Sequence, residues 1–244
     1  MAFPPVHTGA THGLARILSK LGVSSRSEAE AAVRAGRVTV DGRLVLDAEA
    51  RTPASAAIAL DGTPVSAAPP VYLMLNKPRG LVTTRSDPEG RPTVYACLEG
   101  LDLPHVAPVG RLDKASEGLL LMSNDTVWAN AILDGPRAPL KTYHVQIDRP
   151  ADEALLAALL TGVDDRSEHL SAKSARSLRE GTRNAWLEIV LDEGRNRQIR
   201  RLMDAFEIAT LRLVRVSIGE LALGDLAKGT VRPLTDAEIA ALSG

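Results

Sequence analysis

The sequence predicts an α+β protein in which a small N-terminal module precedes a larger domain built on a mainly antiparallel, mixed sheet. Two observations carry this prediction. Near the N-terminus, two helical patterns are followed by a hairpin pattern. After residue 70, many alternating apolar segments are joined by short turns rather than by regular long helices, and this arrangement is typical of antiparallel pairing.

Composition limits the classes of protein that fit. The chain has 244 residues and is 45% hydrophobic but only 3% aromatic, so aliphatic side chains must build the core. The one cysteine, Cys97, excludes a disulfide framework and a cysteine-cluster metal site. The N-terminal residues MAFPPVHTGATHG lack the pattern of a signal peptide, and no apolar run reaches the length that spans a bilayer. We therefore expect a soluble, cytoplasmic protein that does not bind membranes.

Positive charge is concentrated in two zones, although the formal net charge is only -1. Residues 14–43 hold six Lys or Arg and three Asp or Glu, and residues 195–215 hold six Arg and two acidic residues. Two such zones are compatible with two sets of phosphate contacts. Two solvated basic faces would give the same pattern, so this alternative stays open.

The first zone has a clear internal order after a flexible leader expected over residues 1–13. Apolar residues from Leu14 to Leu21 share one helical face, and Gly22 ends that helix. Ser25 and Ser27 start a second helix with the capping-box pattern, and Asp41-Gly42 predicts a hairpin turn. The module is expected over residues 14–66 and a linker over 67–70. Its candidate RNA-binding residues are Arg16, Lys20, Arg26, Arg34 and Arg37.

The larger domain, expected over 71–244, contains the following predicted elements. Strands are expected at 71–75, 141–147, 172–178, 185–191 and 211–218, with a further short strand within 219–226. Helices are expected at 93–98, 126–133 and 152–160, from about 195 to 206, and from 235 onward. Residues 83–93 and 134–139 are expected to form loops. The apolar run Leu119–Met122 fits either a buried strand or a buried helix segment.

The stretch GRLDKASEGLLLMSND at 110–125 holds the most informative acid, Asp113, just before that apolar run. A buried carboxylate needs a partner, although an ordinary turn or cap residue is the more common fate of such an aspartate. Lys77 ends a buried strand, where a ligand-facing residue and a solvated turn lysine are about equally compatible with the sequence. Tyr143 lies in an alternating strand, and four arginines open the helix after Gly194 in a pattern that suits anion binding.

Two resemblances give these residues a context. The segment LARILSKLGVSSRSEAEAAVRAGRVTVDGRLV resembles the ribosomal-protein-S-four-like (αL) RNA-binding domain. The motifs LNKPRG (75–80), GRLDKASEGLLLMSND (110–125), KTYHV (141–145) and EGRNRQIRRL (193–202) resemble bacterial rRNA pseudouridine synthases of the RsuA/RluB type. Ser116 and Asp125-Thr126 depart from that pattern, where threonine and Asp-Gly are usual.

The second resemblance implies a cofactor-free isomerisation of uridine to pseudouridine, with an active-site cleft. It makes Asp113 the nucleophile, which attacks either the ribose or the uracil ring. It makes Tyr143 the ring that stacks on the base, and it pairs Arg200 with Asp113 so that the carboxylate stays ionised. Arg197 and Lys77 are expected to hold phosphates, and Arg111 to orient the loop or meet a phosphate.

The expected partner is ribosomal RNA, with the large-subunit 23S rRNA favoured, and the expected state is a monomer without metal. A 16S rRNA synthase and a non-catalytic RNA-binding assembly factor are the alternatives. A hydrolase using Asp113 is a third reading, but the sequence offers no second catalytic acid or base for it.

Overall fold

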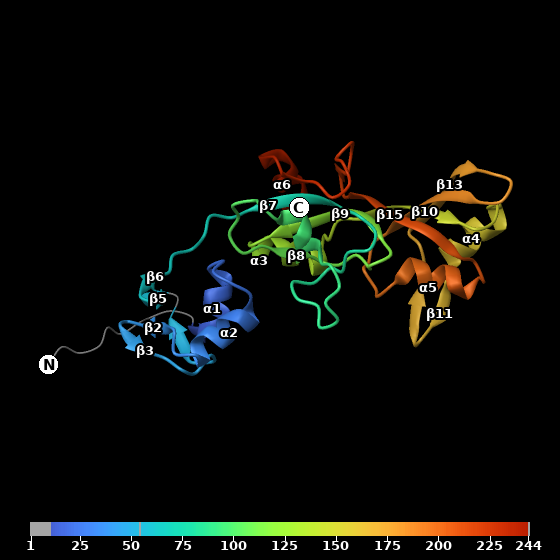
Figure 1. The fold of residues 1–244 in the computed structure, drawn as a ribbon. Helices are drawn as coiled ribbons and strands as arrows, with labels where there is room; N and C mark the ends of the chain where they lie inside the picture. The colour runs from blue at the N-terminus through green and yellow to red at the C-terminus, as the bar shows by residue number, and fades with distance from the viewer. Residues whose placement is uncertain (1–10, 54, 244) are drawn as a thin grey trace. The chain divides into compact units, whose positions relative to one another are not determined.

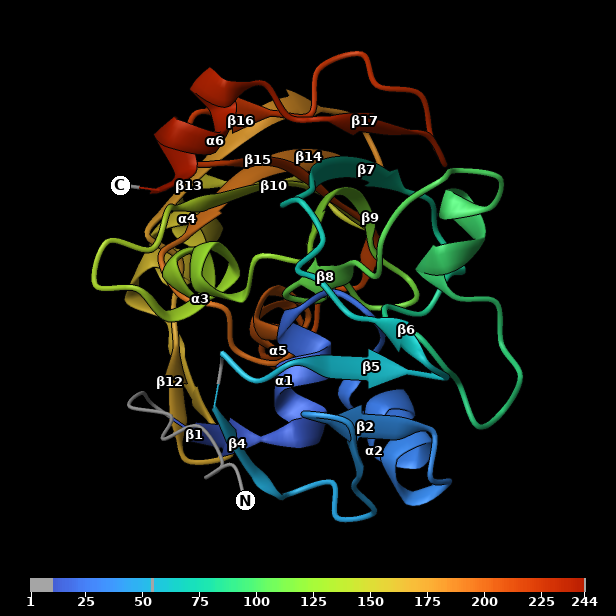
Figure 2. The same cartoon turned by 90° about the vertical axis from the view of Figure 1, so that its left-hand side faces the viewer.

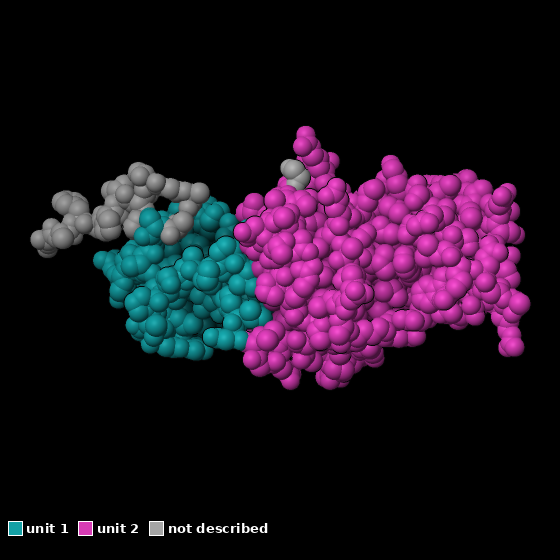
Figure 3. Space-filling model, turned by 90° about the horizontal axis from the view of Figure 1, so that it is seen from above, with its two compact units in different colours: residues 1–71, 102–106, 124–126 teal, residues 72–101, 107–123, 127–244 magenta. Residues whose placement is uncertain are grey.

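The computed structural model describes residues 11–53 and 55–243. The chain forms two compact units, coloured separately in Figure 3. The first comprises residues 1–71, 102–106 and 124–126, and the second comprises 72–101, 107–123 and 127–244. Residues 1–10 of the expected leader, which was placed at 1–13, lie outside the described residues. Its last three residues, 11–13, are a strand, so the expectation of a flexible leader is wrong there.

The first unit contains the predicted order of helix, helix and hairpin (Figure 1). Its elements are β1 (Thr11–Gly13), α1 (Leu14–Lys20), α2 (Arg26–Arg34), β2 (Val38–Val40), β3 (Arg43–Leu44), β4 (Arg51–Pro53), β5 (Ile58–Leu60) and β6 (Thr63–Pro64). The strands pair as a β3-β2-β5-β6 sheet and a separate β1-β4 pair. Leu14, Leu18 and Val33 are at most 1% exposed and form the centre of this small core.

Local sequence explains where the helices of this unit begin and end. The Ser25 side chain accepts a hydrogen bond from the Glu28 amide, and the Glu28 side chain accepts one from the Ser25 amide, which confirms the predicted capping box. Gly22 and Gly36 follow the two helices with positive φ angles of 74° and 70°. Glycine tolerates this left-handed backbone, so both helices end where the sequence predicted.

The second unit is organised on one large sheet, with strand order β13-β14-β10-β15-β9-β7-β17. β16 also pairs with β15, and β8 with β9. The sheet strands are β7 (Tyr72–Lys77), β8 (Ala107–Val109), β9 (Glu117–Ser123), β10 (Lys141–Ile147), β13 (Ser174–Glu180), β14 (Ala185–Leu191), β15 (Thr210–Ile218), β16 (Leu221–Ala222) and β17 (Val231–Pro233). β9 and β15 pair in parallel, and the other pairs named here are antiparallel. The expected mainly antiparallel, mixed sheet is therefore confirmed.

Helices and one hairpin complete the second unit. They are the 3-10 helix η1 (Val94–Leu98), α3 (Thr126–Asp134), α4 (Glu153–Thr161), the hairpin of β11 (Val163–Asp165) and β12 (Glu168–Leu170), α5 (Gln198–Ala205) and α6 (Asp236–Ser243). In Figures 1 and 2, α3 and α5 lie on the same side of the sheet. None of the helices in residues 11–53 and 55–243 is long and apolar enough to cross a membrane.

The apolar run Leu119–Met122 is a strand, which resolves the strand-or-helix ambiguity. All seven residues of β9 are buried, because β9 is a central strand with β7 and β15 on its two edges. The sequence patterns missed β8, β17 and the β11–β12 hairpin. These segments have three residues per strand, which is too short to show a period of two reliably.

Gly118 lets β9 approach β15 closely. A Cβ atom on this residue would lie 2.3 Å from the backbone oxygen of Arg215, and Gly118 has a φ angle of 100°. Both the contact and the backbone angle exclude a larger side chain. Gly118 therefore fixes the parallel contact that sets Arg215 beside the strand following Asp113.

We predict that Gly118→Ala lowers the free energy of unfolding by roughly 3 kcal/mol or more, because it adds a backbone clash to an unfavourable φ. Urea denaturation measures this change. Gly224→Ala is the matched control, since Gly224 also has positive φ but has no atom within 4 Å of the added Cβ. The control should cost only about 1 kcal/mol. Equal losses in the two variants would show that the contact with β15 is unimportant.

Candidate active site

A pocket of about 290 Å³ lies in the second unit, over one face of the large sheet. Its floor includes Lys141 and Tyr143 of β10 and Arg215 of β15. Its sides include Asp113, the end of α3 at Leu133 and Asp134, and the start of α5. The charged residues lining the pocket are Arg111, Lys141, Arg195, Arg197 and Arg215 against Asp113 and Asp134. Five cations against two acids favour an anionic substrate.

The loop that holds Asp113 is fixed through its backbone. Each of the five carbonyl oxygens from Leu112 to Ser116 accepts a hydrogen bond from a residue outside the loop. The donors are the Thr83 hydroxyl to Leu112 (2.7 Å), Lys77 Nζ to Asp113 (3.1 Å) and Ser116 (2.8 Å), the Gly80 amide to Lys114 (2.7 Å) and Arg200 Nη2 to Ala115 (3.2 Å). The backbone is thus immobilised while the Asp113 side chain stays directed at the pocket, where it is 32% exposed.

Lys77 is a structural residue at the centre of this arrangement. It is 0% exposed, and its ammonium group also donates to the Pro78 carbonyl at 3.2 Å. Burial lowers the pKa of Lys77 to about 8, against the opposing influence of Asp113 and Glu117. The expectation that Lys77 holds an RNA phosphate is wrong, because its side chain is enclosed and its three donors already have partners.

The ion pair of Asp113 is with Arg197. Arg197 Nη1 lies 3.4 Å from Asp113 Oδ2, and both side chains are partly exposed, at 46% and 32%. Arg197 occupies the N-cap position of α5 with a φ angle of 50°. A left-handed backbone is unfavourable for arginine and is found preferentially at functional positions. Asp113 therefore has a weak, solvent-accessible ion-pair partner.

The prediction that Arg200 pairs with Asp113 is wrong, because the Asp113 carboxylate pairs with Arg197 instead. Arg200 is only 9% exposed, and it donates to the backbone carbonyls of Ala115 and Thr210 at 3.2 and 3.3 Å. Burial and the nearby Arg197 lower the pKa of Arg200, while Asp113 acts in the opposite direction. Arg200 thus ties the Asp113 loop to the start of β15. The sequence alone could not show whether Arg197 or Arg200 pairs with Asp113, because both lie at the start of the same helix and either could reach the carboxylate.

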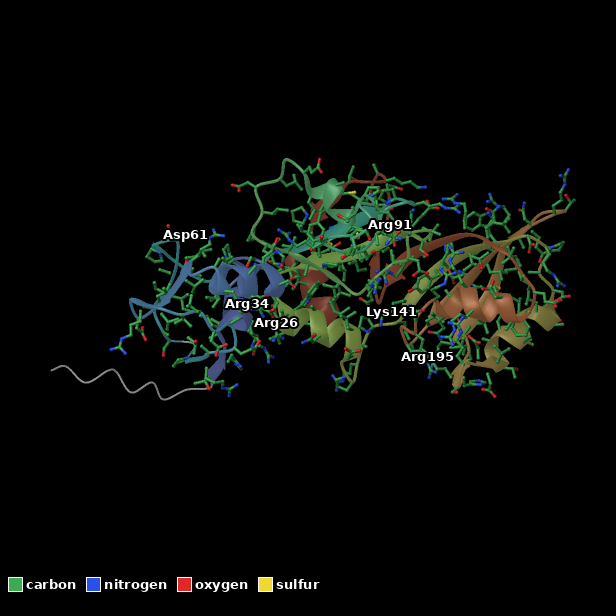
Figure 4. The ribbon with its side chains drawn as sticks, turned by 60° about the horizontal axis from the view of Figure 1, so that its bottom comes forward. Arg26, Arg34, Asp61, Arg91, Lys141 and Arg195 are labelled. Atoms are coloured by element: carbon green, nitrogen blue, oxygen red, sulfur yellow. The ribbon has the colours of Figure 1, made fainter. Side chains whose placement is uncertain are left out.

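The remaining arginines of this segment also differ in their environment. Arg201 is 9% exposed, and it binds Asp165 at 2.5 Å and Glu168 at 2.6 Å, so it anchors the β11–β12 hairpin to α5. Arg195 lines the pocket but is paired with Glu193 at 2.7 Å. Of the four arginines predicted to bind an anion, only Arg195 and Arg197 face the pocket. Figure 4 shows Arg195 near Lys141.

The pocket brings together two of the other sequence candidates and two residues that sequence reasoning had not assigned. Tyr143 and Arg111 line it, the first from a strand and the second from an exposed loop. Lys141 and Arg215 also line it, although they are only 7% and 5% exposed. The sequence did contain an indication of their burial. Lys141 lies on the same face of its strand as the buried Val145, and Arg215 lies on the same face of its strand as the buried Leu213.

The candidate RNA-binding residues of the first unit are of two kinds: some form ion pairs with acidic side chains, and others do not. Arg26 pairs with Glu49 at 2.9 Å, Arg34 pairs with Glu30 at 3.5 Å, and Arg37 pairs with Asp61 at 2.5 Å. Figure 4 shows Arg26 and Arg34 on α2. Arg16 and Lys20 are exposed, lie one turn apart on α1, and form no ion pair within 4 Å with any other described residue. Residues 11–53 and 55–243 contain no cluster of three or more His, Cys, Asp or Glu side chains that could bind a metal ion.

Comparison with known proteins gives this geometry a family. A family model described as RNA pseudouridylate synthase matches residues 71–205, and a model of the S4 domain matches residues 13–51. An uncharacterised RNA pseudouridine synthase of Aquifex aeolicus is 36% identical over 231 residues, which is 93% of this chain and 92% of that protein. A crystal structure of a pseudouridylate synthase superposes with a TM-score of 0.65 and 30% identity, covering 95% of this chain and 99% of that one.

Two further relatives have names that specify a subunit of the ribosome. Ribosomal large subunit pseudouridine synthase B of Bacillus subtilis is 31% identical over 93% of both chains. The protein of the same name from Escherichia coli O157:H7 is 36% identical over 86% of this chain and 74% of its own length. The chain belongs to the RNA pseudouridine synthase family, with an S4 domain preceding the synthase domain.

We predict that Lys77→Met lowers the free energy of unfolding by about 2–4 kcal/mol, because it leaves buried carbonyl groups without donors. It should also lower the single-turnover rate by roughly 100-fold through displacement of Asp113. The dissociation constant for RNA should change little, because Lys77 is not exposed to it. Lys173→Met is the control, since Lys173 is 59% exposed and forms only a surface ion pair. A large loss of RNA affinity without loss of stability would instead support a phosphate contact.

Proposed function

We propose that this protein isomerises a uridine of the large-subunit 23S rRNA to pseudouridine, with Asp113 as the nucleophile and without a cofactor. The observation that carries the proposal is the arrangement of Asp113. Every backbone carbonyl from Leu112 to Ser116 accepts a hydrogen bond, while the Asp113 carboxylate faces a basic pocket beside Tyr143. A nucleophilic carboxylate must be held in place, and the hydrogen bonds to the backbone of this loop meet that requirement. The choice of the large subunit is supported by the names of the relatives from Bacillus subtilis and Escherichia coli.

The individual roles follow from the contacts. Arg197 pairs with Asp113, while Arg200 holds the loop through a hydrogen bond to the Ala115 carbonyl. Tyr143 offers its ring to the target base, which must be splayed out of any helix before it can react. Attack at the anomeric carbon forms an ester and expels the uracil ring with the electron pair of the broken carbon–nitrogen bond. Attack at carbon six of the ring instead forms a bond to the base and places an electron pair on the ring as an enolate.

On the ribose route, the released ring turns, carbon five attacks the anomeric carbon and displaces the Asp113 carboxylate, and carbon five then loses its proton while ring nitrogen one is protonated. On the carbon-six route, the glycosidic carbon–nitrogen bond breaks with its electron pair going to nitrogen one, and the ring, still bonded to Asp113, turns so that carbon five bonds to the anomeric carbon. Loss of the carbon-five proton then expels the Asp113 carboxylate from carbon six, and nitrogen one is protonated. A non-catalytic assembly factor has no need of a nucleophile fixed in this way, and this difference separates the two hypotheses.

The first unit is proposed to bind structured rRNA as an S4 domain over residues 14–66, joined by residues 67–70 to the synthase domain over 71–244. Arg16 and Lys20 are the strongest candidates for phosphate contacts, because their charges are not neutralised by an acidic neighbour within ion-pair distance. We further propose that the protein acts as a monomer in the cytoplasm, where rRNA is processed.

We predict that Asp113→Asn abolishes pseudouridine formation, with a rate loss on the order of 10⁴-fold or more, because an amide is a poor nucleophile. Carbodiimide modification followed by primer extension on 23S and 16S transcripts measures the product. RNA affinity should remain within about threefold, and Asp225→Asn, which changes an exposed aspartate outside the pocket, should behave like the wild type. Identical modification maps for wild type and Asp113→Asn would exclude the proposed mechanism. Product in the 16S transcript alone would assign the small subunit instead.

We predict that the double variant Arg16→Ala/Lys20→Ala weakens RNA binding roughly tenfold at physiological salt and lowers the salt-dependence slope by about two. Filter binding over a range of salt concentrations measures both quantities. Arg37→Ala is the matched control, because the Arg37 charge is already paired with Asp61. A double variant that binds like the wild type would remove α1 from the RNA interface.

A further inference from the structure

Two buried cations at the floor of the pocket have no role in the chemistry derived so far. Lys141 and Arg215 are 7% and 5% exposed. The Arg215 Nε donates to the Leu119 carbonyl at 2.7 Å, but its Nη2 is buried and has no hydrogen-bond partner. Within residues 11–53 and 55–243, the Lys141 ammonium forms no ion pair within 4 Å with an acidic side chain. Burying charged groups in this state is unfavourable, and such an arrangement is expected where a ligand completes it.

The two side chains are close enough to influence each other. Burial lowers the pKa of Lys141, and the charge of Arg215 lowers it further, while Asp134 and Asp192 act in the opposite direction. Both residues also line the pocket that contains Asp113. Lys141 and Arg215 are therefore neighbouring positive charges on one side of the pocket that contains Asp113.

Their position relative to Tyr143 indicates which part of the substrate they meet. Arg215 lies directly opposite Tyr143 in the β10–β15 register, and Lys141 lies two residues before Tyr143 on the same face of β10. A base placed against Tyr143 therefore has its edge within the region of these two side chains. The more exposed Arg111 and Arg197 lie nearer to solvent, where a hydrated phosphate is contacted at lower cost.

We propose that Lys141 and Arg215 form a subsite for the carbonyl oxygens of the uracil ring and stabilise the negative charge that develops there during the reaction. This inference rests on the proposed function. It does not depend on the point of attack of Asp113. Attack on ribose leaves the electron pair of the carbon–nitrogen bond on the ring, and attack on carbon six gives an enolate oxygen, so both routes require a cationic environment at the ring oxygens.

The two cations stabilise the transition state more than they stabilise the bound substrate. Neutral uracil interacts only moderately with two cations, whereas an anionic ring interacts strongly, so the cations lower the energy of the transition state more than that of bound substrate. Their burial increases the effect, because charges interact more strongly in a medium of low dielectric constant. The β10 and β15 strands hold both groups in place before the reaction begins.

The kinetic test uses the full-length protein and saturating 23S transcript in single turnover. Lys141→Met should lower the rate constant by on the order of 100-fold, as removal of one oxyanion donor does, while the dissociation constant and salt slope for RNA stay near wild type. Lys141→Arg should recover much of the rate because it restores the charge. Arg212→Met is the control, since Arg212 lies on β15 but binds Glu117 and does not line the pocket. A lower salt slope with an unchanged rate would assign Lys141 to a phosphate and overturn the proposal.

A binding test is independent of turnover and uses three small probes: barbiturate, which is an anionic analogue of the uracil ring, neutral uracil, and inorganic phosphate. Barbiturate should stabilise the wild-type protein in thermal unfolding more than uracil does, and Lys141→Met should weaken its binding at least tenfold. Arg215→Lys, which keeps the charge but not the guanidinium geometry, should weaken it less. Lys141-dependent stabilisation by phosphate but not by barbiturate would overturn the subsite. If barbiturate binds as expected but no transcript is modified, the subsite stands and the proposed function fails.

Discussion

The second unit depends on one buried ammonium group. Lys77 ends β7, and its Nζ reaches the carbonyls of Asp113 and Ser116 at 3.1 and 2.8 Å. Those two carbonyls mark the start and the end of the short turn that presents the Asp113 side chain. A charged donor with several backbone acceptors is strongly bonded in a buried site, whereas the same acceptors left without it would be unfavourable. Since β7 and β9 are also paired strands, the sheet itself determines where the carboxylate stands.

The site separates structural cations from cations that remain available to substrate. Lys77 and Arg200 are occupied by backbone carbonyls, and Arg201 by two carboxylates. The acid on the neighbouring strand, Glu117, shows the same principle: burial alone raises its pKa, but Arg212 and Lys228 together bring it below the usual value. By contrast, Arg215 Nη2 is buried without a hydrogen-bond partner among the described residues, and Lys141 lines the same pocket. Arg200 Nε is also buried without such a partner, but Arg200 does not line the pocket. A count of basic residues in the sequence therefore overstates the charge that the substrate meets.

Sequence reasoning succeeded where a pattern is local and failed where a side chain must choose among partners. The capping box at Ser25, the strand containing Tyr143 and the position of Asp113 beside a buried run all follow from neighbouring residues. The choice of Arg197 over Arg200 depends instead on where α5 begins after a left-handed residue, and the burial of Lys77 depends on contacts 36 and 39 residues away. Such tertiary contacts leave no periodic signal.

The weakness of the Asp113–Arg197 pair is itself consistent with a nucleophile. At 3.4 Å and with both groups partly exposed, it contributes little to stability, in contrast to the short contacts of Arg201. A carboxylate locked into a short bidentate pair would have to break it before attacking a substrate. Arg197 nevertheless keeps an unfavourable backbone angle at the N-cap of α5, where a glycine would adopt the same φ without strain. The guanidinium at this position therefore serves the ion pair with Asp113 rather than the stability of the helix.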